Sequence, residues 1–371
     1  MKLGLGALAL GMGVTAFGQS PVISSFSQNG ELVCTNLAAG SVATVEWASS
    51  VTGPWTNNWA GLESVGVDSN GMIRVRVPLF YRVRGAAAPA RMAFIPGGSF
   101  EMGDTFNEGN SDERPTHTVY VSGFYMDKYE VTKALWDEVF QWATNHGYSF
   151  GTPGAGKADD YPVHSTTWHG MAKWCNARSE KEERIPAYYT DAAQTAVFRT
   201  GATDVQNDWV KWNVGYRLPT EAEWEKAARG GLGGRRFPWG DTISHSQANY
   251  YGTTTDVYDV SPTQGLHPAY ADGEEPHTAP TGSFAANGYG LYDMTGNVWE
   301  LCWDWYDSTY YSSSPASDPR GPATGTERLR RGGGWGVNSP AYNCRVSFRA
   351  SWAPNIYNYR VGFRCVLPPG P

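Results

Sequence analysis

The sequence GLYDMTGNVWE, residues 290–300, is the most informative stretch of this chain. Its two glycines permit tight bends, its two carboxylates can turn toward those bends, and Trp299 adds a large apolar surface. Two further motifs stand upstream and downstream of it, RLPTEAEWE at residues 217–225 and RGGGW at residues 331–335. Motifs of this kind are typical of a domain whose turns are fixed by buried aromatic side chains.

The three motifs, in this order, resemble the formylglycine-generating enzyme family, also called sulfatase-modifying factors. The resemblance extends over about residues 92–366, which is most of the chain. It implies an α+β domain of C-type-lectin-like architecture that is rich in loops. In the family, a copper-binding pair of cysteines oxidises a sulfatase cysteine with oxygen.

The composition agrees with such a fold and narrows the possible partners. The 371 residues include 16 Trp and 44 Gly, a combination that predicts irregular loops pinned by buried aromatics. The formal net charge of −7 argues against a nucleic-acid partner, because such proteins need a basic face to neutralise phosphates.

The N-terminus has the pattern of an export signal. Lys2 precedes an apolar stretch, residues 3–17, and Ala16-Phe17-Gly18 offers the small residues that a signal peptidase requires. We therefore expect residues 1–18 to be a cleaved signal peptide and the mature protein to be periplasmic or secreted. The stretch is short for a membrane span, and no other segment predicts one.

Two domains follow the signal. Short alternating runs separated by turn signals predict a small all-β module over residues 19–85, with strands at 42–47 and 72–77. Residues 86–91 predict a linker, and residues 92–371 the formylglycine-generating-enzyme-like domain. The small module carries no catalytic constellation, which favours a structural or adhesive role.

Three helices are predicted in the larger domain. One starts at Thr132, and a second extends over about residues 168–182. The third starts at Thr220, where Glu223 completes a capping box, and Gly230-Gly231 is expected to end it.

Calcium is the cofactor that the sequence supports best, because a hard cation needs many oxygens on a tightly bent chain. Similarity to the family's calcium sites implies side-chain ligands from Asp293 and Glu300 and backbone oxygens from Gly296 and Val298. A looser match implies a second site from the residues Asn249, Tyr250, Asp272 and Glu274. The alternative is that these carboxylates and amides only hydrogen-bond loop backbone.

The five cysteines leave at least one thiol without a partner inside the chain, since their number is odd. The resemblance implies a disulfide between Cys175 and Cys365. The pairing of Cys34, Cys302 and Cys344 stays open.

The sequence departs from the family at the catalytic thiols, where it has Val337 and Tyr342. Soft thiolates suit copper(I), so we expect no copper here and no genuine formylglycine-generating activity. In related iron-dependent enzymes the iron ligands involve a separate helical domain with a His-rich motif, which this sequence lacks, so we do not expect iron either. Cys302 and Cys344 are catalytic candidates only if they approach each other as a redox pair. A buried thiol or a simple disulfide is the alternative for each.

The last segment indicates a different function. Tyr, Trp and Asn dominate binding loops, because rigid aromatics give contact area and amides give adaptable hydrogen bonds. The residues of this kind predicted to line a ligand-binding cleft are Trp335, Asn338, Tyr342, Asn343, Trp352, Asn355, Tyr357 and Tyr359. The framework of this segment resembles the C-type-lectin-like variant of the fold used in hypervariable ligand-binding proteins. It consists of GGGW at residues 332–335, NCR at 343–345, FR at 348–349 and GFR at 362–364.

Two hypotheses follow. The first is a calcium-stabilised module that binds a protein, peptide or glycan. The second is a metal-dependent oxidoreductase of the same superfamily with an altered active site.

Overall fold

A computed structural model describes most of the chain. The described residues are 22–26, 31–47, 64–76, 81–86 and 89–369. The chain divides into two compact units, Met1–Pro96 and Gly97–Gly370. The predicted signal peptide, residues 1–18, lies outside the described residues. Within the described ranges, no helix is long and apolar enough to cross a membrane.

The first unit is all β in its described part. One antiparallel sheet has the order β1-β2-β5, with bounds Val22–Phe26, Glu31–Thr35 and Ile73–Arg76. The other has the order β4-β3-β6, with bounds Val65–Gly66, Val42–Trp47 and Tyr81–Ala86. A small apolar core is formed by Leu32, Cys34, Leu37, Ala43, Val67, Ile73 and Val75. Both predicted strands are confirmed, and β7, Met92–Ile95, follows them.

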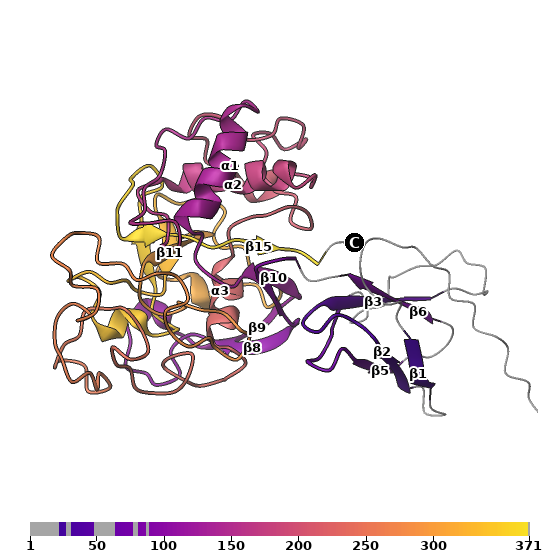
Figure 1. The fold of residues 1–371 in the computed structure, drawn as a ribbon, viewed down its shortest axis with the longest axis horizontal. Helices are drawn as coiled ribbons and strands as arrows, with labels where there is room; N and C mark the ends of the chain where they lie inside the picture. The colour runs from indigo at the N-terminus through magenta and orange to yellow at the C-terminus, as the bar shows by residue number, and fades with distance from the viewer. Residues whose placement is uncertain (1–21, 27–30, 48–63, 77–80, 87–88, 370–371) are drawn as a thin grey trace, which may run out of the picture. The chain divides into compact units, whose positions relative to one another are not determined.

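The three predicted helices of the second unit are present. Helix α1, Lys133–Thr144, begins after Thr132, whose side chain accepts from the Leu135 amide at 3.2 Å. Helix α2, Trp168–Lys181, lies beside α1 and is buried along most of its length (Figure 1). Trp174 of α2 stacks on Trp136 of α1, with ring centres 5.7 Å apart.

Helix α3, Glu221–Ala228, confirms the capping box. The Thr220 side chain accepts from the Glu223 amide, and the Glu223 carboxylate accepts from the Thr220 amide. Beyond the helix, Gly230 and Gly231 have φ angles of 57° and 86°. A side chain at either position would be strained in that left-handed backbone, so these glycines end the helix as expected.

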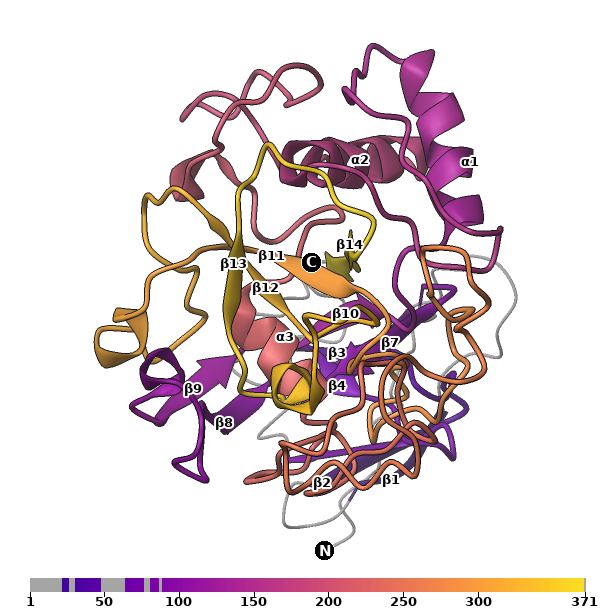
Figure 2. The same cartoon turned by 90° about the vertical axis from the view of Figure 1, so that its left-hand side faces the viewer.

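Short strands complete the unit. A four-stranded sheet has the order β13-β12-β11-β14, with bounds Ala350–Trp352, Arg328–Arg331, Trp299–Trp305 and Val361–Gly362 (Figure 2). Strand β14 is parallel to β11, and the other pairs are antiparallel. Two antiparallel pairs are β8 with β9, Gly98–Met102 and His117–Val121, and β10 with β15, Phe124–Asp127 and Val366–Leu367.

Loops make up much of what remains. The short 3₁₀ turns are η1, η2, η3 and η4, with bounds Ser111–Glu113, Asn207–Trp209, Tyr310–Ser312 and Ala341–Cys344. The structure describes all of residues 229–298 and assigns no helix or named strand there. The predicted α+β, loop-rich class is therefore confirmed.

Buried ion pairs replace regular structure as the framework of this unit. Glu225 is fully buried, and its carboxylate accepts from Arg331 and, at 2.7 Å, from Arg229. Burial alone would raise the pKa of Glu225, but these two guanidinium groups hold it below its usual value. Glu221 likewise pairs with Arg349 through two bonds of 2.6 and 2.9 Å. Helix α3 is thereby joined to β12 and to the chain preceding β13.

Replacing Arg331 by methionine tests this framework. The change leaves the Glu225 carboxylate with one guanidinium fewer and also removes donors to the carbonyls of Val346, Ser347 and Phe348. We expect a loss of about 3–5 kcal/mol in unfolding free energy, measured by urea denaturation. The control is Lys181→Gln, which breaks a surface pair with Glu138 and should cost less than about 1 kcal/mol. Equal losses would contradict the framework role of the buried pair.

Candidate functional site

In the segment from Trp335 to Tyr359, the exposed residues are 337, 338, 342 and 355–357, whereas residues 343–349 are buried. Four of the predicted ligand-contacting residues are exposed: Asn338, Tyr342, Asn355 and Tyr357. Tyr342 and Tyr357 have 41% and 59% of their surface exposed, which is high for such large side chains. Figure 2 shows the connection from β13 to β14 as a long yellow loop.

Two of the predicted cleft residues lie beneath this surface. Trp335 is only 1% exposed, because its backbone amide is tied to the Asn297 carbonyl and its ring packs on His277 and Tyr359. Asn343 is 6% exposed, and its amide donates to the Asn338 carbonyl at 3.1 Å. Both can support the loops, but neither presents its side chain to the solvent.

The remaining two predicted residues border the surface. Trp352 and Tyr359 are partly exposed. The Trp352 indole donates to the Ile356 carbonyl at 2.9 Å, which fixes the exposed turn that carries Ile356 and Tyr357. The Arg360 guanidinium lies 5.0 Å from the Trp335 ring centre and 5.2 Å from that of Tyr359.

A third loop, not expected from the sequence, joins this surface. The Tyr342 amide donates to the Asp256 carboxylate at 3.2 Å, and the neighbouring Val257 is 92% exposed. We use the name loop face for the exposed side chains of residues 253–260, 336–342 and 354–360, which are Thr254, Thr255, Val257, Val260, Val337, Asn338, Tyr342, Asn355, Ile356 and Tyr357. Sequence reasoning missed Val257 because no local pattern links these separate loops.

The first predicted calcium region is a buried carboxylate cluster. Asp293 adopts a left-handed backbone with φ 55°, which turns its side chain inward. One oxygen, Oδ2, accepts from the Gly282 amide at 2.6 Å, whereas the buried Oδ1 has no hydrogen-bond partner. Burial raises the pKa of Asp293 to about 6, and Glu300 adds to that rise.

Glu300, the other predicted side-chain ligand, already has strong donors. Arg364 approaches its two oxygens at 2.6 and 2.8 Å, and the Trp224 indole donates to it at 2.8 Å. A guanidinium therefore occupies the position in which a cation was expected to contact Glu300.

A third carboxylate, Glu130, was missed by the sequence analysis. It is buried and accepts from the Asn297 side chain at 2.6 Å and from the Val298 amide at 3.1 Å. Burial, followed by the charges of Asp293 and Glu300, raises the pKa of Glu130 well above its usual value. Three carboxylates thus face one guanidinium, that of Arg364, and the unpartnered Asp293 oxygen is a donor that a hard cation prefers.

Residues of the second predicted calcium region have hydrogen-bond or ion-pair partners within the chain. Asn249 is buried with its Oδ1 unpartnered, but Asp272 is half exposed and pairs with Lys157. The Tyr250 carbonyl already accepts from His245 at 3.2 Å, and the Glu274 amide approaches Asp272 rather than a shared centre. In the described part of the chain, no three His, Cys, Asp or Glu side chains form a group that could hold a metal.

All five cysteines are free thiols and all are buried, with at most 1% exposure. The Sγ atoms of Cys175 and Cys365 lie 3.5 Å apart, next to each other but not bonded. Cys302 lies on β11, whereas Cys344 packs with Tyr250 and Phe237 in a separate apolar cluster.

The thiols of Cys302 and Cys344 are poor thiolates. Burial raises the pKa of Cys302 well above its usual value, and the charge of Asp304 adds to the effect. Burial also raises the pKa of Cys344, with Asp259 and Asp256 as further causes. Reactive cysteines require the opposite environment, electropositive and accessible.

Comparison with known proteins assigns the chain to a protein family. The profile of the sulfatase-modifying factor enzyme 1-like domain matches residues 82–368. The chain belongs to this family. It is 38% identical to a formylglycine-generating enzyme of Streptomyces coelicolor, over 73% of this chain and 87% of that protein. It is 33% identical to the chaperone protein LppX of Paenibacillus barcinonensis, over 74% of this chain and 88% of that protein.

Solved structures share the family's fold. Treponema denticola variable protein 1 matches with a TM-score of 0.56 and 27% identity, over 75% of this chain and 94% of that one. PvdO from Pseudomonas aeruginosa matches with a TM-score of 0.55 and 25% identity, also over 75% and 94%. The expected family and architecture are thus confirmed.

The state of the thiols can be measured directly. We expect no rapid reaction of the native protein with a thiol reagent, because every cysteine is buried. After unfolding without reductant, the protein will show three reactive thiols if Cys175 and Cys365 have formed the disulfide that the family resemblance implies. Five reactive thiols would show that these neighbours stay reduced. Fast labelling of Cys302 or Cys344 in the native state would contradict the buried environment.

Proposed function

We propose that the chain is an exported ligand-binding member of the sulfatase-modifying factor family, with the loop face as its binding surface. The observation that carries the proposal is the exposure of Val337 and Tyr342, at 53% and 41%. These residues match the family's catalytic thiols, so an exposed apolar residue and an exposed aromatic residue stand where a redox pair would meet its substrate.

The chemistry of the loop face supports binding. Its exposed Tyr342, Tyr357 and Ile356 supply apolar contact area, and Asn338 and Asn355 supply amide donors and acceptors. This mixture is enriched in binding loops, because two-torsion aromatics lose little entropy on contact. The hydrogen bonds from the Trp352 indole to the Ile356 carbonyl and from the Tyr342 amide to the Asp256 carboxylate hold the loops in place before a ligand arrives. The ligand class is a protein, peptide or glycan.

Family membership alone does not decide between binding and oxidation. The Streptomyces coelicolor relative is named a formylglycine-generating enzyme and the Paenibacillus barcinonensis relative a chaperone. Oxidation through copper needs accessible thiolates, and the donor set of this chain offers buried thiols of raised pKa instead. The 38% identity to the Streptomyces enzyme is the observation that favours the second candidate function, an oxidoreductase with an altered active site.

We also propose that calcium stabilises the domain through Asp293. The buried, unpartnered Oδ1 of Asp293 and the surplus of carboxylate over guanidinium around it fit a hard cation. The charge of Glu300 raises the pKa of Asp293, and Glu300 would share its oxygens with Arg364. The charge of Asp293 in turn raises the pKa of Glu130. Calcium here supplies structural charge neutralisation. The pattern of residues 1–18 supports export to the periplasm or the medium, where calcium is abundant enough to fill such a site.

Binding by the loop face is testable on glycan and peptide arrays with the purified mature protein. We expect a reproducible ligand class whose affinity falls about tenfold in Tyr342→Ala, the size of a binding hot spot. The matched control is Tyr120→Ala, because Tyr120 is exposed to the same degree, 42%, but lies on β9. Equal losses in the two variants, or no binding by the wild type, would overturn the proposal.

The oxidoreductase alternative has its own test. The copper-reconstituted protein is incubated with a cysteine-containing sulfatase peptide and oxygen, and mass spectrometry detects formylglycine. We expect no turnover, with the Streptomyces coelicolor enzyme as the positive control. Turnover that disappears in Cys302→Ser or Cys344→Ser would establish the alternative instead.

Calcium binding is read from thermal unfolding. Saturating calcium should raise the melting temperature, since about 2–3 kcal/mol of stabilisation follows at a hundredfold excess over the dissociation constant. We expect the increase to disappear in Asp293→Ala and to persist in Asp272→Ala, the control from the second predicted region. An increase that persists in Asp293→Ala but disappears in Asp272→Ala would indicate a site in the second predicted region. No increase in the wild type would contradict calcium binding.

A further inference from the structure

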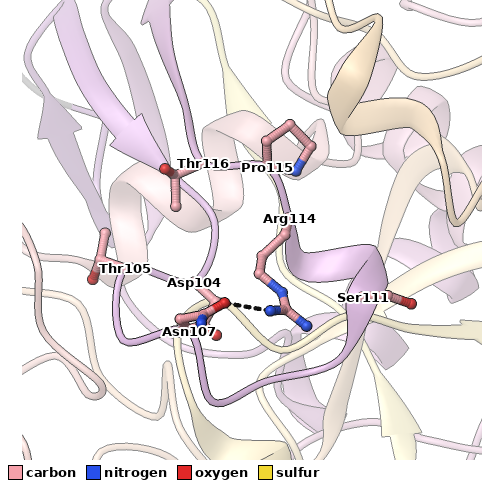
Figure 3. A pocket seen from close by; sticks show the side chains of 7 residues that line it. All are labelled: Asp104, Thr105, Asn107, Ser111, Arg114, Pro115 and Thr116. Carbon is pink, nitrogen blue, oxygen red and sulfur yellow. Dashed lines mark hydrogen bonds between the residues drawn. The ribbon is translucent and has the colours of Figure 1, made fainter.

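A separate hollow lies in the connection from β8 to β9. Its volume is about 730 Å³, and it is lined by Asp104, Thr105, Asn107, Ser111, Arg114, Pro115 and Thr116 (Figure 3). Apart from Pro115, every lining side chain is polar. None of these residues belongs to the loop face, so the hollow is independent of the function proposed above.

The loop around the hollow is held rigidly from within. Asp104 is only 4% exposed, and its carboxylate accepts from the amides of Phe106, Glu108 and Gly109 at 2.7–2.9 Å. The preceding Gly103 amide donates to Glu225 at 2.8 Å, which ties the loop to the buried ion pairs of α3. The hollow is therefore preformed, and its shape does not depend on a ligand.

Arg114 is the cation of the hollow, and its charge has no carboxylate partner. Its guanidinium donates to the Asn107 side chain (Figure 3) and, at 3.3 Å, to the Gly109 carbonyl. Its buried Nε has no partner. No ion pair of Arg114 occurs with any carboxylate in the described ranges.

The carboxylates near Arg114 form ion pairs or hydrogen bonds with other groups. Glu108 forms a two-bond pair with Arg236 at 2.6 and 2.9 Å. Glu113 forms a two-bond pair with Arg345 at 2.8 and 2.9 Å. The Asp104 charge is shared among three backbone amides. Arg114 is thus left with Nη hydrogens for an acceptor from outside the chain, held in a fixed orientation by Asn107.

The surroundings of Arg114 indicate the chemistry of that acceptor. The planar fork of a guanidinium matches a carboxylate, with which it forms two parallel hydrogen bonds. The hydroxyls of Thr105, Ser111 and Thr116 each offer one donor and two acceptor positions, which suit the hydroxyl groups of a sugar. Pro115 adds an apolar surface for the carbon face of a sugar ring. The volume of the hollow is large enough for a ligand bigger than a simple ion.

We propose that this hollow binds a carboxylated sugar, the uronic-acid class found in acidic polysaccharides. Arg114 receives the carboxylate, and the hydroxyls of Thr105, Ser111 and Thr116 receive the ring hydroxyls. Both features are needed for affinity, because the guanidinium alone does not distinguish a sugar acid from any other carboxylate.

Calorimetric titration of the full-length mature protein with D-galacturonate tests the proposal. D-galactose, which has the same ring without the carboxylate, and acetate, which has only the carboxylate, are the comparison probes. We expect galacturonate to bind about tenfold more tightly than either, the ratio that one charge-assisted hydrogen-bond pair supplies. Arg114→Gln should lose that preference, and Arg235→Gln, an exposed arginine on another loop, should keep it.

A second variant distinguishes a loss of binding from a loss of folding. Thr105 is exposed, so Thr105→Val should leave the melting temperature unchanged while weakening galacturonate about threefold or more through the loss of one hydroxyl contact. Galactose or acetate binding as tightly as galacturonate would overturn the proposal. So would the absence of galacturonate binding by the wild type, or unchanged binding in Arg114→Gln.

Discussion

The ion pairs between the carboxylates of α3 and four arginines, two of them from distant parts of the chain, hold the second unit together. Glu221 and Glu225 lie four residues apart and so share one side of the short helix, whereas Glu223 leaves on the opposite side. Glu221 and Glu225 reach Arg349 and Arg331 from distant parts of the chain. Arg217 and Arg229 flank the helix and pair with Glu223 and Glu225. A buried charge without its partner is costly, so these pairs fix the loops that supply the arginines.

This framework explains how a domain with so few strands presents an ordered surface. A further buried pair lies next to the loop face: Arg345, which pairs with Glu113, also donates to the Tyr342 carbonyl at 3.2 Å. The pair of Arg345 with Glu113 therefore connects the two places: Arg345 contacts the loop face, and Glu113 immediately precedes Arg114 of the hollow. Rigid support beneath variable loops is what lets one fold carry different functions.

Burial and nearby charges also determine the ionisation of the thiols and the carboxylates of this unit. Cys302 and Cys344 are enclosed by the core, and nearby acids disfavour their thiolate forms. Around Asp293, by contrast, burial gathers more acid groups than Arg364 can neutralise. The unpartnered oxygen of Asp293 is the observation on which the calcium proposal rests.

The sequence by itself determined the family, the fold class, the three helices and the strands at residues 42–47 and 73–76. These depend on local signals, such as the Thr220 cap and the alternation along a strand, which act within a few residues. Only the tertiary structure decided that Trp335 is buried, that Glu130 joins Asp293, and that Arg364 binds Glu300. Such contacts join residues far apart in the chain, and no local pattern records which distant side chain will occupy a given space.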